Sequence, residues 1–151
     1  MKYTLNQVKK VFSDFADDHQ QIHTFGFGDI GELNTSGVTT YPTMWVMPEP
    51  STIRNKQVHL NFRVYFMDLI HKGNHLQRDE VWSDQLLIAT DLVAHLADMD
   101  KSGAFDTYFN FDPDNISIEP FLDEFDDEVA GWNMTIEIPV LFSKDKCAIP
   151  T

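Results

Sequence analysis

One stretch of the sequence has part of the spacing of a calcium-binding loop, residues 98–109 (DMDKSGAFDTYF). Asp98, Asp100 and Asp106 occupy the first, third and ninth positions of an EF-hand loop, and a helical pattern leads into it. The last position of such a loop needs a bidentate glutamate, but here it holds Phe109. A helix end followed by a polar loop explains these residues equally well, so we predict no metal site.

The six histidines include two pairs at four-residue spacing, His19/His23 and His71/His75. On one helix face such a pair can bind zinc. The first pair begins at a predicted helix end, the second ends in a predicted turn, and no HExxH motif is present. The only cysteine, Cys147, lies in the tail over residues 143–151, and no serine has a GxSxG context. We therefore predict no catalytic residue, no metal ligand and no cofactor.

Three glycines, Gly26, Gly28 and Gly31, form a GxGxxG string. A dinucleotide-binding loop with this spacing opens a helix. Here the string is followed by residues 32–37 (ELNTSG) and then by strand-like residues, so no helical pattern begins. The sequence predicts a short strand that ends in a turn, with an exposed loop over residues 34–39.

The densest carboxylates lie within residues 116–142 (ISIEPFLDEFDDEVAGWNMTIEIPVLF). The second half alternates apolar and polar residues, which predicts a strand with one buried face. The first half predicts a strand that Pro120 restricts to a sheet edge. We expect a β-hairpin with an acidic tip, solvated rather than catalytic, that contacts partners. The residues expected to make these contacts are Pro120, Phe121, Asp123, Glu124, Asp126, Asp127, Glu128 and Trp132.

The other elements follow from hydrophobic periodicity. A helix capped by Thr4 runs to about Asp17, and a longer one covers residues 78–99. The apolar stripe of the longer helix contains Trp82, Leu86, Ala89, Val93 and Leu96, widened by Leu87, Ile88 and Leu92. Strands are predicted over residues 43–47, closed by two prolines, over 57–71, long enough to form an arm, and over 107–111. The pattern predicts one α+β domain over residues 1–151: a mostly antiparallel sheet covered by two helices, with an extended β-hairpin arm.

The formal net charge of −13 argues against direct binding to nucleic acid. Residues 11–53 and 102–143 contain no lysine or arginine, whereas phosphate binding requires a basic patch. No run of apolar residues is long enough to span a membrane, and the first residues lack the apolar segment of a secretory signal. With one cysteine, the fold cannot depend on an internal disulfide. We therefore expect synthesis in the cytoplasm.

Four stretches together resemble small neck proteins of tailed phages of Bacteroidetes-type bacteria: YPTMWVMP, VHLNFRVYFMDLIHKGN, EVWSDQLLIATDLVAHL and ISIEPFLDEFDDEVAGWNMTIEIPV. These proteins belong to the head–tail connector and tail-terminator group. The resemblance implies a virion structural protein, made in the host cytoplasm, that forms a ring of six or twelve copies. Its neighbours would be portal, neck and tail proteins. DNA would pass nearby without specific binding, and no membrane would be involved.

Two other classes of function stay open. The hairpin edge could serve a protein-binding adaptor, because an exposed strand edge accepts an extended peptide. A metal-carboxylate enzyme would use the acidic residues from Asp98 to Asp106. The leading expectation is a ring subunit of the virion and not an enzyme.

Overall fold

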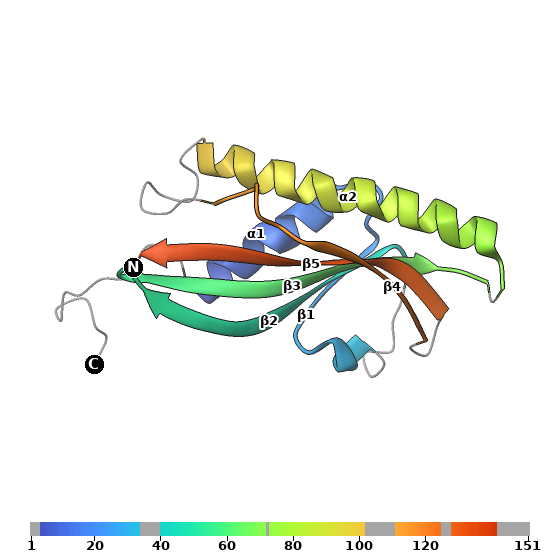
Figure 1. Ribbon diagram of the computed structural model, residues 1–151, viewed down its shortest axis with the longest axis horizontal. Coiled ribbons are helices and arrows are strands. Elements are labelled where there is room, and N and C mark those ends of the chain that lie inside the picture. Colours follow the sequence, from blue (N-terminus) through green and yellow to red (C-terminus); the bar gives the residue numbers. More distant parts are fainter. Residues whose placement is uncertain (1–3, 34–39, 72, 102–110, 125–127, 142–151) are drawn as a thin grey trace.

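Five strands form one sheet in the order β1-β2-β3-β5-β4 (Figure 1). The computed structural model describes residues 4–33, 40–71, 73–101, 111–124 and 128–141. β1 pairs in parallel with β2, and the other neighbours are antiparallel. The elements in chain order are α1 (Leu5–Asp18), β1 (Thr24–Phe27), the 3-10 helix η1 (Ile30–Leu33), β2 (Thr43–Arg54), β3 (Gln57–Leu69), α2 (His75–Lys101), β4 (Ile118–Glu124) and β5 (Glu128–Leu141). This confirms the predicted α+β fold with a mostly antiparallel sheet.

The first helix begins at a capping box. The Thr4 hydroxyl accepts the Gln7 N–H at 3.2 Å, and the Gln7 side chain accepts the Thr4 N–H at 2.8 Å. Near its end Lys10 pairs with Asp14 at 2.8 Å, which gives one of the acidic residues there a partner within the helix. Phe12 and Phe15 are buried on the face that meets the sheet. Local capping and periodicity thus account for the start and the orientation of α1.

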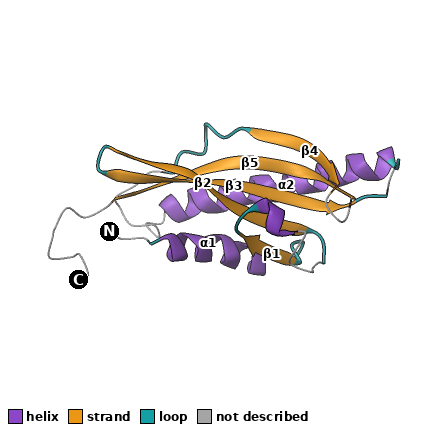
Figure 2. Cartoon of the chain, turned by 90° about the horizontal axis from the view of Figure 1, so that it is seen from below, coloured by secondary structure: helices purple, strands orange, loops and turns teal. Residues whose placement is uncertain are grey.

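Both helices cover the same face of the sheet, as predicted (Figure 2). His19 Nε2 lies 3.0 Å from the Asp91 carboxylate, which ties the end of α1 to α2. The Phe15 ring also contacts His95 of α2, with ring centroids 5.5 Å apart. The main core joins the inner faces of α1 and α2 to one face of the strands, and its largest fully buried side chains include Phe12, Phe62, Phe66, Leu92, Leu96, Ile136 and Ile138.

The predicted apolar stripe of the long helix is only partly buried. Leu87, assigned to the buried stripe, is 63% exposed, while Trp82 and Leu86 are only partly buried. The buried side of α2 is formed by Val81, Gln85, Ile88, Ala89, Leu92 and Leu96. The prediction is confirmed for Ile88, Ala89, Leu92 and Leu96 and wrong for Leu87. Because α2 carries apolar residues around most of its circumference, periodicity alone does not fix the limits of the inner face.

The second strand is longer than predicted, because β2 continues through Pro48 and Pro50 to Arg54. β1 pairs only with the first four residues of β2, so the prolines lie where β2 has no second neighbour among the described strands. A proline is tolerated there because no ladder hydrogen bond from its nitrogen is needed. The register with β3 shifts between Glu49 and Thr52, which accommodates the second proline.

Residues Asn55 and Lys56 form the turn between β2 and β3, with φ angles of 53° and 63°. Two left-handed residues match the two-residue hairpin turn that fits the twist of antiparallel strands. β3 is not a free arm, because it pairs with β5 from Gln57 to Leu69 and with β2 on its other side. The part that extends past the ends of both helices is therefore a three-stranded end of the sheet, made from β2, β3 and β5 (Figure 1).

A smaller apolar cluster lies on the sheet face opposite the helices. It contains Leu33 of η1 with Trp45, Met67 and Val129 from three strands. Gly26 lies against the Trp45 ring, where a Cβ atom would collide, and the Trp45 Nε1 donates to the Gly28 carbonyl at 3.0 Å. The GxGxxG string therefore supports a tryptophan and leads into a 3-10 turn, as expected for a strand end.

The predicted hairpin is present as β4 and β5, and β4 is an edge strand as Pro120 implied. Its tip, residues 125–127, lies outside the described residues. The predicted strand over residues 107–111 also lies outside them, except for Phe111, which is buried in the main core without strand pairing. The tail over residues 143–151 likewise lies outside the described part of the chain.

Gly131 allows β5 to approach β3 closely, because a Cβ atom there would collide with the Phe66 backbone oxygen and lie 2.9 Å from the Met67 Cα. We predict that Gly131→Ala lowers the free energy of unfolding by about 3 kcal/mol, the upper end for overpacking. Urea denaturation measures the change. Gly31→Ala is the control, since its Cβ would lie 3.4 Å from a side-chain oxygen of Asp29. Equal losses in both variants would contradict the prediction.

Burial raises the pKa of the Asp68 carboxyl at the end of β3, and the charge of Asp84 adds to this effect. A carboxyl with a raised folded-state pKa destabilises the fold once it ionises, so stability falls as pH rises through that pKa. We predict that Asp68→Asn raises the melting temperature at pH 7. The difference should vanish below the unfolded pKa of about 3.9. A pH-independent difference in thermal melts would exclude this explanation.

Candidate interaction surface

Two tryptophans attach the β4–β5 hairpin to α2. Trp132 Nε1 of β5 donates to the Trp82 carbonyl at 2.7 Å, and Trp82 Nε1 donates to the Phe121 carbonyl of β4 at 3.2 Å. Both indole rings are only partly buried, so each meets its hydrogen-bonding needs while part of its apolar ring stays at the surface. The hairpin is therefore held against the helix and still presents aromatic surface.

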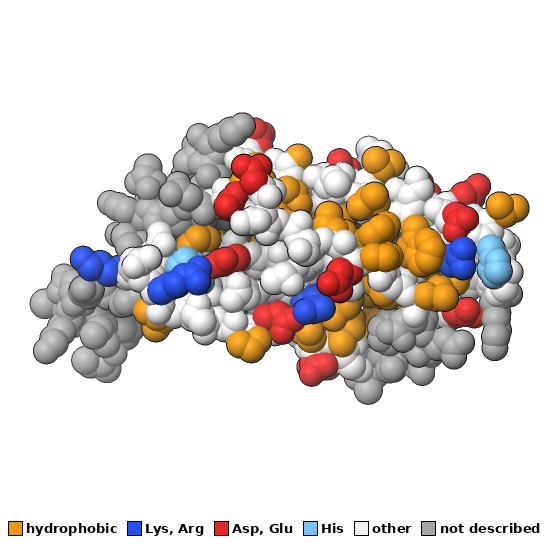
Figure 3. Space-filling model, viewed as in Figure 1, with side chains coloured by type: hydrophobic (Ala, Val, Ile, Leu, Met, Phe, Trp, Pro, Cys, Tyr) orange, Lys and Arg blue, Asp and Glu red, His pale blue; other side chains and the backbone are white. Residues whose placement is uncertain are grey.

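Exposed leucines also lie on α2 and on the β4–β5 hairpin. Leu76 and Leu87 of α2 are 79% and 63% exposed, and Leu122 of β4 is 53% exposed. Figure 3 shows hydrophobic side chains gathered over the N-terminal half of α2 and the neighbouring hairpin. We call this set, Leu76, Trp82, Leu87, Leu122 and Trp132, the apolar face. A contiguous apolar patch on a folded protein is typical of a protein-interaction site.

A basic side chain borders the apolar face. The Arg78 guanidinium lies 4.9 Å from the centroid of the Trp82 ring and pairs with the exposed Asp79 at 3.1 Å. An apolar centre with charged residues at its rim is the usual anatomy of a protein interface. The arrangement favours recognition of another protein over binding of a small molecule.

The structure separates the residues predicted to contact partners. Pro120 lies opposite Trp132 in the β4–β5 register, so these two belong to one surface. Phe121 points to the other face of the sheet, where its ring packs edge-on against Tyr65 at 5.8 Å between centroids. Glu128 is partly buried at the start of β5, and its carbonyl accepts the Ile70 N–H at 3.1 Å. The partner-contact role of these residues stays a prediction.

The remaining acidic residues of the predicted set lie at or beyond the limit of what the structure describes. Asp123 and Glu124 pair through their backbones with Val129 and Glu128 at the end of β4. Asp126 and Asp127 lie outside the described residues. The acidic tip therefore stays an expectation based on sequence.

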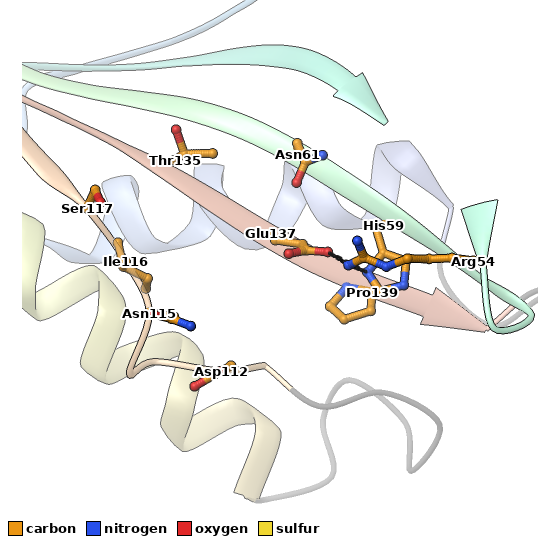
Figure 4. A pocket seen from close by; sticks show the side chains of 10 residues that line it. All are labelled: Arg54, His59, Asn61, Asp112, Asn115, Ile116, Ser117, Thr135, Glu137 and Pro139. Carbon is orange, nitrogen blue, oxygen red and sulfur yellow. Dashed lines mark hydrogen bonds and ion pairs between the residues drawn. The ribbon is translucent and has the colours of Figure 1, made fainter. Parts of the chain in front are cut away.

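The outer edge of β5 is only half covered. β4 pairs with β5 from Glu128 to Met134, whereas from Thr135 to Leu141 the described partner is β3 alone. A groove of about 480 Å³ lies between this uncovered edge and residues 112–117, which approach α2 (Figure 4). Such an edge leaves backbone donors and acceptors available to another strand.

A polar cluster lines this groove. Glu137 accepts hydrogen bonds from Arg54 at 2.8 Å and from His59 Nδ1 at 2.5 Å (Figure 4). His59 is 7% exposed, and its buried Nε2 has no hydrogen-bond partner among the described residues. A catalytic triad needs a nucleophile bonded to the second nitrogen of the histidine. The described groove therefore holds a histidine–carboxylate pair that joins adjacent strands, without a bonded hydroxyl or thiol.

The candidate metal ligands whose side chains the structure describes do not form a cluster. Within the described residues, no group of three or more His, Cys, Asp or Glu side chains is arranged to hold a metal ion. Asp98 and Asp100 lie within α2, while Asp106 lies outside the described residues. His19 pairs with Asp91 across the two helices, and His75 is exposed at the start of α2. Cys147 also falls outside the described part of the chain.

Sequence reasoning missed the apolar face and the groove. Leu76 and Leu87 are eleven residues apart, about three helical turns, so their shared outward side could have been recognised from spacing once the inner face was known. No comparable signal exists for Arg54, His59 and Glu137. Their contact depends on the pairing of β3 with β5, which joins residues 78 positions apart.

Comparison with known proteins gives no family model that matches this chain, and no curated protein that matches its sequence. In the described residues, no helix combines the length and apolar character needed to cross a membrane.

Trp132→Phe should selectively loosen the hairpin, because it removes the N–H that donates to the Trp82 carbonyl. We expect a loss of about 1 kcal/mol in unfolding free energy, the usual net value of one hydrogen bond. Hydrogen exchange should show reduced protection in the β4 amides. Trp45→Phe is the matched control, since it removes a similar bond to Gly28 on the opposite face. Equal deprotection of β4 in both variants would argue against the role of Trp132.

Proposed function

We propose that this protein is a structural subunit of a phage neck or tail end, which forms a ring between portal and tail around the DNA channel. The observation that carries the proposal is the uncovered edge of β5 from Thr135 to Leu141. Because backbone groups at a sheet edge can pair with another strand, such an edge suits contact between subunits. The resemblance of four sequence stretches to neck proteins suggests the class of assembly.

Among the described strands, β2 and β5, the two long strands beside β3, each lack a second neighbour at the same end of the sheet. β1 covers only Thr43 to Val46 of β2, and β4 covers only the first half of β5. The uncovered halves lie on either side of β3, because Gln57 is in register with both Arg54 and Leu141. One copy therefore offers two different edges, which is the requirement for head-to-tail contact that closes into a ring.

Prolines limit how these edges can pair. Pro48 and Pro50 lie in the uncovered half of β2, and Pro139 lies in that of β5. Since proline cannot donate a hydrogen bond, only short segments such as Thr135 to Ile138 are suited to strand addition. Short pairing segments favour a specific partner and disfavour open-ended aggregation.

The apolar face supplies a second contact area at the opposite end of the molecule from the β2–β3 turn (Figure 1). Leu122, one of its leucines, is 53% exposed. Complete burial of an exposed leucine side chain contributes about 1.5–3 kcal/mol. A chain with contact areas at both ends is suited to a stacked or circular assembly. The net charge of −13 would repel a DNA duplex passing through the lumen, which prevents adhesion.

A second candidate is a protein-binding adaptor. The groove beside β5 favours it, because residues 112–117 form a wall that faces the strand edge and could contact the side chains of an added peptide. The adaptor would use the same edge with a different chain in place of another copy. Identification of the bound chain distinguishes the two functions.

Native mass spectrometry of the purified chain tests the proposal. We expect a closed oligomer, or a monomer that becomes a ring when portal or tail proteins of the same virion are added. A monomer that binds none of these proteins would refute the proposed function. Capture of a non-virion protein along the β5 edge, with the chain still monomeric, would support the adaptor.

Leu122→Asp should weaken the assembly about 10- to 100-fold, because it places a charge in the apolar face and removes the burial energy of one leucine. The oligomer dissociation constant from light scattering measures this, and circular dichroism checks that the fold is unchanged. Leu5→Asp on α1 is the control, since Leu5 is similarly exposed, at 47%. Equal weakening by both variants would show that the apolar face has no special role.

A further inference from the structure

A separate cleft of about 310 Å³ lies where the end of β3, the middle of α2 and the segment between α1 and β1 meet. Asp68 of β3 and Asp84 of α2 both line it, and they are close enough for the charge of Asp84 to raise the pKa of Asp68. Among the described residues, no lysine or arginine forms an ion pair with either carboxylate. The cleft thus brings together two carboxylates from two elements with no lysine or arginine beside them, and His23 is the basic side chain in its lining.

Gln85 provides an independent sign of a missing ligand. This residue lines the same cleft and is 2% exposed, yet its Oε1 has no hydrogen-bond partner within the described structure. A buried carbonyl oxygen without a donor is destabilising, because the hydrogen bonds it makes to water in the unfolded chain are not replaced. The fold therefore maintains an unsatisfied acceptor next to two carboxylates, an arrangement that a hydrogen-bond donor with positive charge would complete.

The chemistry of the cleft lining suits a donor group on an apolar stem. Pro42 and Ile88 contribute apolar surface to the lining, where methylene groups can pack. A guanidinium carries five N–H donors in one plane, enough to reach two carboxylates and an amide oxygen together. A bare metal ion fits less well, because the described residues supply no cluster of three or more acidic or histidine ligands.

We propose that this cleft binds the side chain of an arginine presented by a partner protein. Asp68 and Asp84 accept the guanidinium hydrogen bonds, and Gln85 Oε1 accepts a further one. The site differs from the β5 edge and the apolar face, and it does not require that the protein form a ring. Its test therefore uses a small probe whose binding is independent of oligomeric state.

The probe is N-acetyl-arginine amide, titrated against the full chain and followed by saturation-transfer NMR, which works for monomers and large oligomers alike. We expect saturable binding with a dissociation constant of the order of 1 mM. N-acetyl-citrulline amide, which has the same shape without the charge, should not bind. Equal binding of both probes would overturn the proposal, and so would tighter binding of spermidine or Mg²⁺, because each would identify a different ligand.

Variants connect the binding to the cleft. Asp84→Asn should weaken probe binding at least about tenfold, because the side chain loses the negative charge that strengthens its hydrogen bond to the guanidinium. Asp79→Asn, on the same helix but outside the cleft, should leave it unchanged. Gln85→Met should weaken binding while the free protein stays equally stable or becomes more stable, since the unsatisfied acceptor is removed. Unaltered binding in Asp84→Asn, or destabilisation by Gln85→Met with binding retained, would refute the assignment.

Discussion

The pairing of β3 along its full length with β2 on one side and β5 on the other is the constraint on which the rest of the structure depends. It places Phe62 and Phe66 under the helices and, by the two-residue period of a strand, directs His59 and Arg63 to the opposite face. Gly131 allows β5 close enough to β3 for this pairing to continue past Trp132. The helices, the hairpin and the grooves all take their positions from these three strands.

The outer strands differ in length from the strands they cover, and this difference creates the surfaces described above. β1 has 4 residues beside the 12 of β2, and β4 has 7 beside the 14 of β5. Each long strand is therefore half covered, and the uncovered halves share one end of the molecule. If all five strands were equally long, β2 and β5 would be paired on both sides along their whole length. Here β2, β3 and β5 extend beyond β1 and β4, and prolines lie in the extended parts of both β2 and β5.

The polar sites have different physical characters. In the groove beside β5, the Glu137 carboxylate accepts from both Arg54 and His59, while the buried His59 Nε2 has no partner among the described residues. In the cleft beside α2, the Asp68 carboxylate accepts the Leu69 N–H, while the buried Gln85 oxygen has no described donor. The first cluster joins strands β2, β3 and β5, and the second has acceptors that an external donor could complete. Cross-strand pairing explains the first, whereas no described donor reaches the Gln85 oxygen of the second.

Local sequence patterns were enough to predict α1, α2, β3, β5 and the edge position of β4. Thr4 caps a helix, Pro120 restricts its strand to an edge, and the alternation around Ile136 indicates a strand, each without reference to distant residues. The sequence could not show that β2 passes Pro48, because proline is tolerated only where a neighbouring strand is missing. It could not fix the limits of the inner side of α2, whose apolar residues surround most of the helix. The Trp82–Trp132 contact, the His59–Glu137 pair and the cleft at Gln85 depend on register and packing between distant segments. Tertiary structure alone decided these sites, because each needs side chains from strands or helices that local forces do not bring together.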